Sequence, residues 1–105
     1  MVENLVILPD AEKDSDSAYA WYEEQRSGLG QRFLAAVESC LTAIRTSPNA
    51  FSPVLEKYRR AVVRRFPFVI FYEYSEESDT VTVFSIFHSS QDPEKWRRRL
   101  SKGAE

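Results

Sequence analysis

The apolar residues of this chain change their period once, from helical spacing to strand spacing, and this change limits the folds open to it. In the first half, apolar side chains recur every three or four positions, as on one face of a helix. From about residue 60 onward, β-branched and aromatic residues follow one another in short runs that are typical of strands. We therefore predict an α+β protein in which helices pack on a sheet.

Two helices are predicted in the first half. One begins at Asp10, whose carboxylate serves as the N-cap, and ends near Arg26. After the turn "SGLG" a second, strongly amphipathic helix continues to Pro48. Its apolar face carries Leu29, Phe33, Val37, Cys40, Leu41 and Ile44. Because the connection is short, we expect an antiparallel two-helix hairpin with one apolar side left for a sheet.

Strands are predicted before and after this hairpin. "ENLVIL" is a short N-terminal strand, and three further strands are expected at Arg60–Phe66, Phe68–Tyr74 and "TVTVFSIFH", the last apolar on both faces and therefore interior. A short C-terminal helix then starts with Asp92 as cap and Pro93 in its first position. The expected order is β-α-α-β-β-β-α in a single domain, residues 1–105, with an antiparallel sheet.

Composition excludes several classes of protein. With 105 residues and 43% hydrophobic content the chain can close one core. One cysteine and one histidine cannot form an internal disulfide or a His/Cys zinc site, so we expect no metal and no cofactor. The start "MVENLVIL" lacks the basic region of a signal peptide, and no apolar run could span a membrane. A cytoplasmic protein is expected.

Positive charge gathers in the second half of the chain. Residues 1–56 hold 4 Lys/Arg and 9 Asp/Glu, whereas residues 57–105 hold 10 and 7. In "RRAVVRRF", strand alternation places Arg60 and Arg64 on one face, where guanidinium groups suit phosphate or an acidic peptide. The alternative is a salt-bridge ladder across the sheet or an ordinary solvated surface.

The C-terminal helix carries a second basic group. Trp96 is expected to point back toward the sheet, while Arg97, Arg98 and Arg99 fan outward. These arginines either form a solvated basic end or meet an acidic partner together with Arg60 and Arg64.

The residue types that could perform catalysis are sparse. His88 is followed by Ser89 and Ser90, but no carboxylate is placed to orient a nucleophile and base, and neighbouring residues on an extended chain point apart. We predict that His88 is a hydrogen-bonding residue at a strand end. Cys40 is predicted to be a buried, inert thiol. The sequence therefore favours a binding protein over an enzyme.

Several motifs in register resemble one known family. These are "YEEQRSGLGQRFL", "YRRAVVRRFPFVIFYEY" and "IFHSSQDPEKW", together with Ala11, Asp14 and Pro48. The series resembles the ParE branch of the RelE/ParE toxin superfamily, the plasmid-stabilisation toxins, from Ala11 to Arg99. The resemblance implies a small toxin of a type II toxin–antitoxin pair that is neutralised in a hetero-oligomer by a cognate ParD-like antitoxin.

The resemblance also frames the choice between two activities. RelE-like members cleave mRNA on the ribosome with basic residues on the sheet, whereas ParE-like members poison DNA gyrase. The positions of two RelE-like arginines fall here on Val69 and Ser89, so the charges that would stabilise a phosphate transition state are missing. Many ParE-like members carry arginine where this chain has Gln91, which suggests an attenuated toxin.

The resemblance and the residues together predict a gyrase-inhibiting toxin without catalytic residues. The alternatives are a RelE-like mRNA endoribonuclease and a non-toxic antitoxin-binding module. Arg65, within "RFPF", is expected to be structural. The predicted partner-binding residues are Arg60, Arg64, His88, Gln91, Trp96, Arg97 and Arg98.

Overall fold

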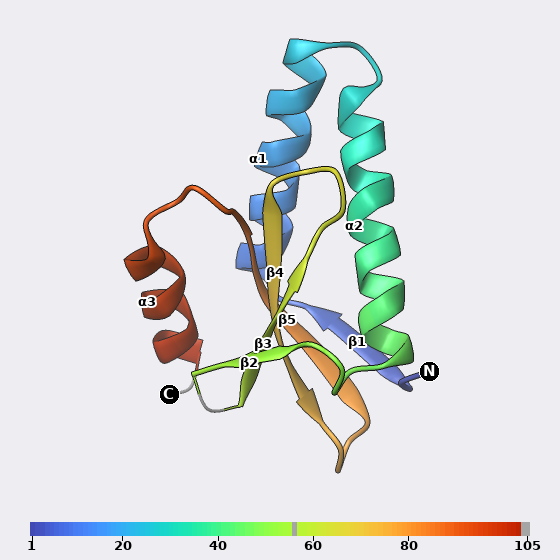
Figure 1. Ribbon diagram of the computed structural model, residues 1–105, viewed down its shortest axis with the longest axis vertical. Coiled ribbons are helices and arrows are strands. Elements are labelled where there is room, and N and C mark those ends of the chain that lie inside the picture. The colour runs from blue at the N-terminus through green and yellow to red at the C-terminus, as the bar shows by residue number, and fades with distance from the viewer. Residues whose placement is uncertain (56, 104–105) are drawn as a thin grey trace.

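The computed structural model describes residues 1–55 and 57–103 and confirms the α+β class. A pair of long antiparallel helices stands beside a twisted sheet, and a third helix lies apart from them on the other side of the strands (Figure 1). The elements in chain order are β1 (Asn4–Ile7), α1 (Pro9–Gln25), α2 (Leu29–Thr46), β2 (Ser52–Val54), β3 (Tyr58–Val62), β4 (Phe68–Ser75), β5 (Thr80–His88) and α3 (Pro93–Gly103).

Three local predictions need correction. The first helix begins at Pro9, and the residue at its N-cap is Leu8, so Asp10 lies inside the first turn, where its charge favours the helix dipole. An extra short strand, β2, forms in the stretch that reads as turns. The strand expected to reach Phe66 ends at Val62, because the chain turns there into β4.

The sheet has the strand order β1-β5-β4-β3-β2. Strands β2 to β5 are antiparallel neighbours, and β1 joins the edge of the sheet in parallel with β5. The interior position predicted for β5 is confirmed. A bulge interrupts the β4–β5 register, so that Phe71 faces Ser85 while Tyr72 faces Val83.

The helix hairpin covers one face of the sheet. Its contact is an aromatic cluster in which Phe33 of α2, fully buried, lies 5.0 Å from Phe68 and 5.5 Å from Phe66, measured between ring centroids. Tyr22 of α1 packs edge-on against Phe66 at 5.0 Å. The "RFPF" segment therefore holds the hairpin to the sheet through its two phenylalanines.

The opposite face is covered by α3. As predicted, Asp92 starts this helix, since its Oδ1 accepts the Glu94 amide N–H at 3.0 Å. Trp96 stacks on Phe71 of β4 with 4.7 Å between ring centroids, and Leu100 is completely buried in the same cluster. The Tyr58 hydroxyl donates to the Leu100 carbonyl oxygen at 3.0 Å. The predicted inward orientation of Trp96 is confirmed.

Candidate partner-binding surface

Arg60 and Arg97 each neighbour one ring of a stacked aromatic pair, Phe71 and Trp96. Arg60 is the β3 residue opposite Phe71, so both side chains stand on the α3 face of the sheet. The Phe71 ring stacks on Trp96, and the guanidinium carbon of Arg97 lies 5.3 Å from the Trp96 ring centroid. Arg97 also pairs with Glu94 at 3.3 Å. We call Arg60, Trp96 and Arg97 the aromatic basic surface.

Arg64 belongs to a different surface. It lies in the turn beyond β3 and lines a groove of about 1090 Å³ between that turn and α2. Arg32 of α2 and Arg65 line the same groove. Strand alternation placed Arg60 and Arg64 on one face, but alternation stops where β3 ends at Val62. The two arginines therefore face different elements.

The loop after β5 folds around His88. The Ser90 amide N–H donates to His88 Nδ1 at 3.0 Å, and the Ser90 hydroxyl lies 2.6 Å from the same nitrogen. Gln91 Oε1 accepts the His88 amide N–H at 2.8 Å. The predicted hydrogen-bonding role of His88 is confirmed, but its partner was not predicted, because a turn brings the Ser90 hydroxyl against the ring. Both the ring nitrogen and the glutamine oxygen are used to shape the loop.

Arg99 does not fan outward as expected. Its Nη1 donates to Oδ2 of Asp14 at 2.5 Å, and its guanidinium carbon lies 4.5 Å from the centroid of the Phe87 ring. The same Asp14 oxygen accepts the amide N–H of Ile86 at 3.0 Å. Pairing of β1 with β5 stops at Val83, so the backbone of β5 beyond Val83 has no neighbouring strand on this side. Asp14 accepts the Ile86 amide N–H that would otherwise be unpaired there.

Burial dominates the electrostatics of Asp14. Its side chain is 15% exposed, and burial raises the pKa of its carboxyl group above 3.8, although the hydrogen bonds from Arg99 and Ile86 act in the opposite direction. No sequence periodicity connects two residues that are 85 positions apart. In the sequence, Asp14 stands out only as a member of the series of family-like motifs, and that series does not show which residue it contacts.

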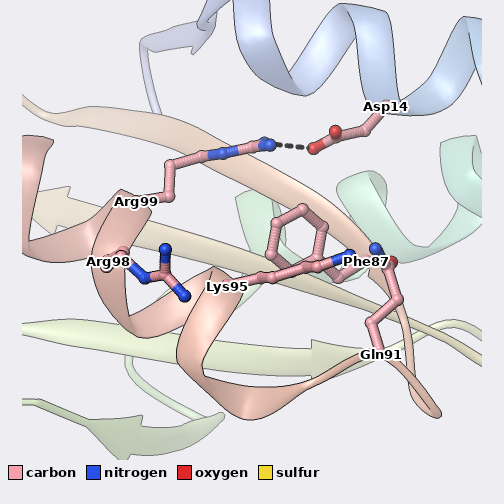
Figure 2. Close-up of a pocket in the computed structure, with 6 residues that line it drawn as sticks. All are labelled: Asp14, Phe87, Gln91, Lys95, Arg98 and Arg99. Atoms are coloured by element: carbon pink, nitrogen blue, oxygen red, sulfur yellow. Dashed lines mark hydrogen bonds and ion pairs between the residues drawn. The ribbon is translucent and has the colours of Figure 1, made fainter.

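A cavity of about 360 Å³ opens beside this ion pair (Figure 2). It is lined by Asp14 from α1, Phe87 from β5, Gln91 from the loop, and Lys95, Arg98 and Arg99 from α3. Arg98 and Gln91, two of the predicted partner-binding residues, therefore meet here and not at the aromatic basic surface.

The remaining predictions concern the thiol of Cys40, metal binding and membrane-spanning helices. Cys40 is buried, as predicted, and burial raises the pKa of its thiol to about 11. Within residues 1–55 and 57–103, no group of three or more His, Cys, Asp or Glu side chains is arranged to hold a metal ion. None of the helices in that part of the chain is long and apolar enough to cross a membrane.

Comparison with known proteins shows the class to which this chain belongs. The family model described as the ParE toxin of the type II toxin–antitoxin system, parDE, matches residues 5–93. None of the curated proteins matches the chain. The chain belongs to this family of ParE toxins.

Solved structures of RelE and ParE systems share the fold. The isolated E. coli RelE toxin is 15% identical with a TM-score of 0.63, over 94% of this chain and 96% of that one. The chromosomal ParDE system from P. aeruginosa is 17% identical with a TM-score of 0.63, over 83% of this chain and 96% of that one. The toxin–antitoxin complex RelBE2 from Mycobacterium tuberculosis is 16% identical with a TM-score of 0.60, over 84% of this chain and 99% of that one. At these identities the likeness concerns the fold alone.

Proposed function

We propose that this ParE-family toxin acts in the cytoplasm by binding and inhibiting DNA gyrase, and that a cognate ParD-like antitoxin neutralises it in a hetero-oligomer. The observation that carries the proposal is the burial of Val69 beneath α3. This position corresponds to an arginine of RelE-like ribonucleases, and here its side chain is 6% exposed within an apolar cluster.

The surroundings of Val69 oppose phosphate chemistry on this face of the sheet. Val69 shares the apolar cluster with Phe71, Phe87 and Leu100, and α3 covers them. A phosphate transition state needs charged donors, and each such donor contributes several kcal/mol in comparable sites. The second RelE-like arginine position holds Ser89, a neutral residue that is exposed in the loop. These features favour binding over RNA cleavage.

The aromatic basic surface is the best candidate for contact with a protein partner. Trp96 and Arg97 are residue types that often dominate binding energy at interfaces, and Arg97 and Arg60 would complement an acidic partner. The proposed partner-binding residues remain Arg60, Arg64, His88, Gln91, Trp96, Arg97 and Arg98. Because they occupy separate surfaces, we assign the aromatic basic surface to one contact and the groove beside Arg64 to another.

A second candidate function is a non-toxic antitoxin-binding module. It is favoured by Gln91, which stands where many ParE-like members carry arginine and whose Oε1 is bonded to the His88 amide N–H. At this position the chain has a loop-shaping amide instead of a cation. Such a protein would bind antitoxin without inhibiting gyrase.

Induced expression without antitoxin separates these functions. Gyrase inhibition predicts growth arrest, a DNA damage response and, with purified proteins, loss of gyrase supercoiling activity. Ribosome-associated mRNA cleavage would contradict the proposal and favour the ribonuclease. Normal growth together with tight antitoxin binding would establish the second candidate instead.

Variants test the assigned surface. Arg60→Ala combined with Arg97→Ala should weaken inhibition of supercoiling, more strongly at low salt than at high salt. The matched control is Lys13→Ala combined with Arg26→Ala, which removes the same charge from exposed positions of α1 and its end. Equal inhibition by both double variants would refute the surface assignment.

A further inference from the structure

The cavity between α1 and α3 concentrates positive charge. Three cations and one carboxylate line it, which leaves a net charge of two positive units. Of the three ion pairs found among the described residues, none involves Lys95 or Arg98. Asp14 is already neutralised by Arg99. The uncompensated charge of the cavity therefore belongs to Lys95 and Arg98.

The cationic groups approach the cavity from one face of α3. Arg98 and Arg99 follow Lys95 by three and four positions, so the three side chains share a side of the helix. Figure 2 shows Lys95 extending toward Gln91 while Arg99 extends toward Asp14. Arg97 lies elsewhere, over the Trp96 ring and paired with Glu94.

Two neighbouring groups are held in place before any ligand arrives. Arg99 is fixed by its bond to Asp14 and by the Phe87 ring, which leaves its other N–H groups available. Gln91 bonds the His88 amide through Oε1, so its side-chain NH₂ group remains as a donor. Immobilised donors bind an anion with a smaller loss of conformational entropy.

We propose that this cavity binds a phosphate group. Donors come from the loop and from successive turns of α3, so that several of them can bind different oxygens of one tetrahedral oxyanion. The phosphate comes either from a small molecule or from a nucleic-acid backbone. Val69 does not line this cavity. Phosphate binding is measured on the toxin alone, so its failure would leave the proposed inhibition of gyrase standing.

The test is an NMR titration of the isotope-labelled toxin. Sodium phosphate is added while chloride holds the ionic strength constant, and adenosine 5′-monophosphate, a single-stranded oligonucleotide and a DNA duplex are titrated in parallel. We expect saturable shifts of amide signals between Gln91 and Arg99. A nucleic-acid source predicts that an oligonucleotide binds at least about tenfold more tightly than free phosphate, whereas a small-molecule source predicts no such gain.

Two substitutions and one control locate the site. Lys95→Gln and Arg98→Gln should each weaken phosphate binding about fivefold or more, since each removes a charged donor. Arg97→Gln removes the same charge from the same helix outside the cavity and should leave binding unchanged. Thermal unfolding provides a second measurement, because phosphate should raise the Tm of the parent above that in equal chloride, and the double variant K95Q/R98Q should lose this rise.

Three outcomes would overturn the proposal. Shifts that grow without saturation would show only general screening of charge. Equal weakening by Arg97→Gln would indicate a diffuse basic surface. A poly-glutamate peptide that binds as tightly as the phosphate probes would show that the cavity does not distinguish phosphate from carboxylate.

Discussion

Arg99 and Asp14 connect the two layers of helices around one edge of the sheet. Arg99 extends from α3 on one face, and Asp14 belongs to α1 of the hairpin on the other, with 2.5 Å between Nη1 and Oδ2. The same carboxylate oxygen accepts the Ile86 amide N–H of β5 at 3.0 Å. One carboxylate therefore joins an edge strand segment, a hairpin helix and the C-terminal helix.

We predict that Arg99→Ala lowers the free energy of unfolding by about 1 to 3 kcal/mol. Removing one member of a buried pair leaves the other charge uncompensated, but the side chains are 15% and 25% exposed, so solvent reduces the effect. A double-mutant cycle with Asp14→Asn, measured by urea unfolding, gives the coupling energy. Additive effects of the two substitutions would contradict the ion pair.

The pH dependence of stability should carry the signature of Asp14. Burial raises the pKa of this carboxyl above 3.8 in the folded state, so the folded protein binds a proton more readily than the unfolded chain. The resulting stability is fully present below the unfolded value and is lost as the pH rises through the raised value. Relative to Asp14→Asn, the parent should therefore become more stable as the pH falls from neutral toward 3.8. An unfolding series of both proteins with pH checks the sign, and an opposite slope would contradict it.

Trp96→Ala should loosen α3. The indole stacks on Phe71, and its loss leaves part of the apolar cluster without a cover, so we expect about 2 to 3 kcal/mol of destabilisation. Amide hydrogen exchange in α3 and denaturant unfolding report the change. Arg98→Ala, an exposed neighbour on the same helix, is the control and should change stability by less than about 0.5 kcal/mol.

Gly30→Ala should destabilise the hairpin, although alanine is normally the better helix former. A Cβ at this position would lie 2.8 Å from two atoms of the Tyr19 ring and 2.9 Å from Glu23 Oε1. Glu23 cannot retreat freely because its carboxylate accepts the Gly28 and Gly30 amide N–H groups. We expect a loss of about 1 to 2 kcal/mol in thermal unfolding. In a Tyr19→Ala background the same substitution should cost less, and an equal cost would exclude the ring contact as its cause.

Positions with local signals were predicted correctly from the sequence. Helix α2 follows from the spacing of Phe33, Val37 and Ile44, all of which are buried. The start of α3 follows from Asp92 and Pro93, and the inward orientation of Trp96 follows from its place in the first turns of that helix. These features depend on backbone geometry within a few residues, and the sequence pattern reports that geometry directly.

Sequence by itself thus determined the helical hairpin, the interior strand β5 and the buried state of Cys40, because period and composition record which side chains avoid water. The family followed from the resemblance of its motifs, taken in register. Tertiary structure alone decided the partners of those side chains. It separated Arg60 from Arg64 by ending β3 at Val62, turned Arg99 inward to Asp14, and brought Lys95 and Arg98 of α3 together with Asp14 and Gln91 around one cavity. The physical reason is that the spacing of apolar residues tells which side of a helix or strand a residue occupies. Whether side chains of α1 and α3 come into contact depends on how both helices pack around the edge of β5.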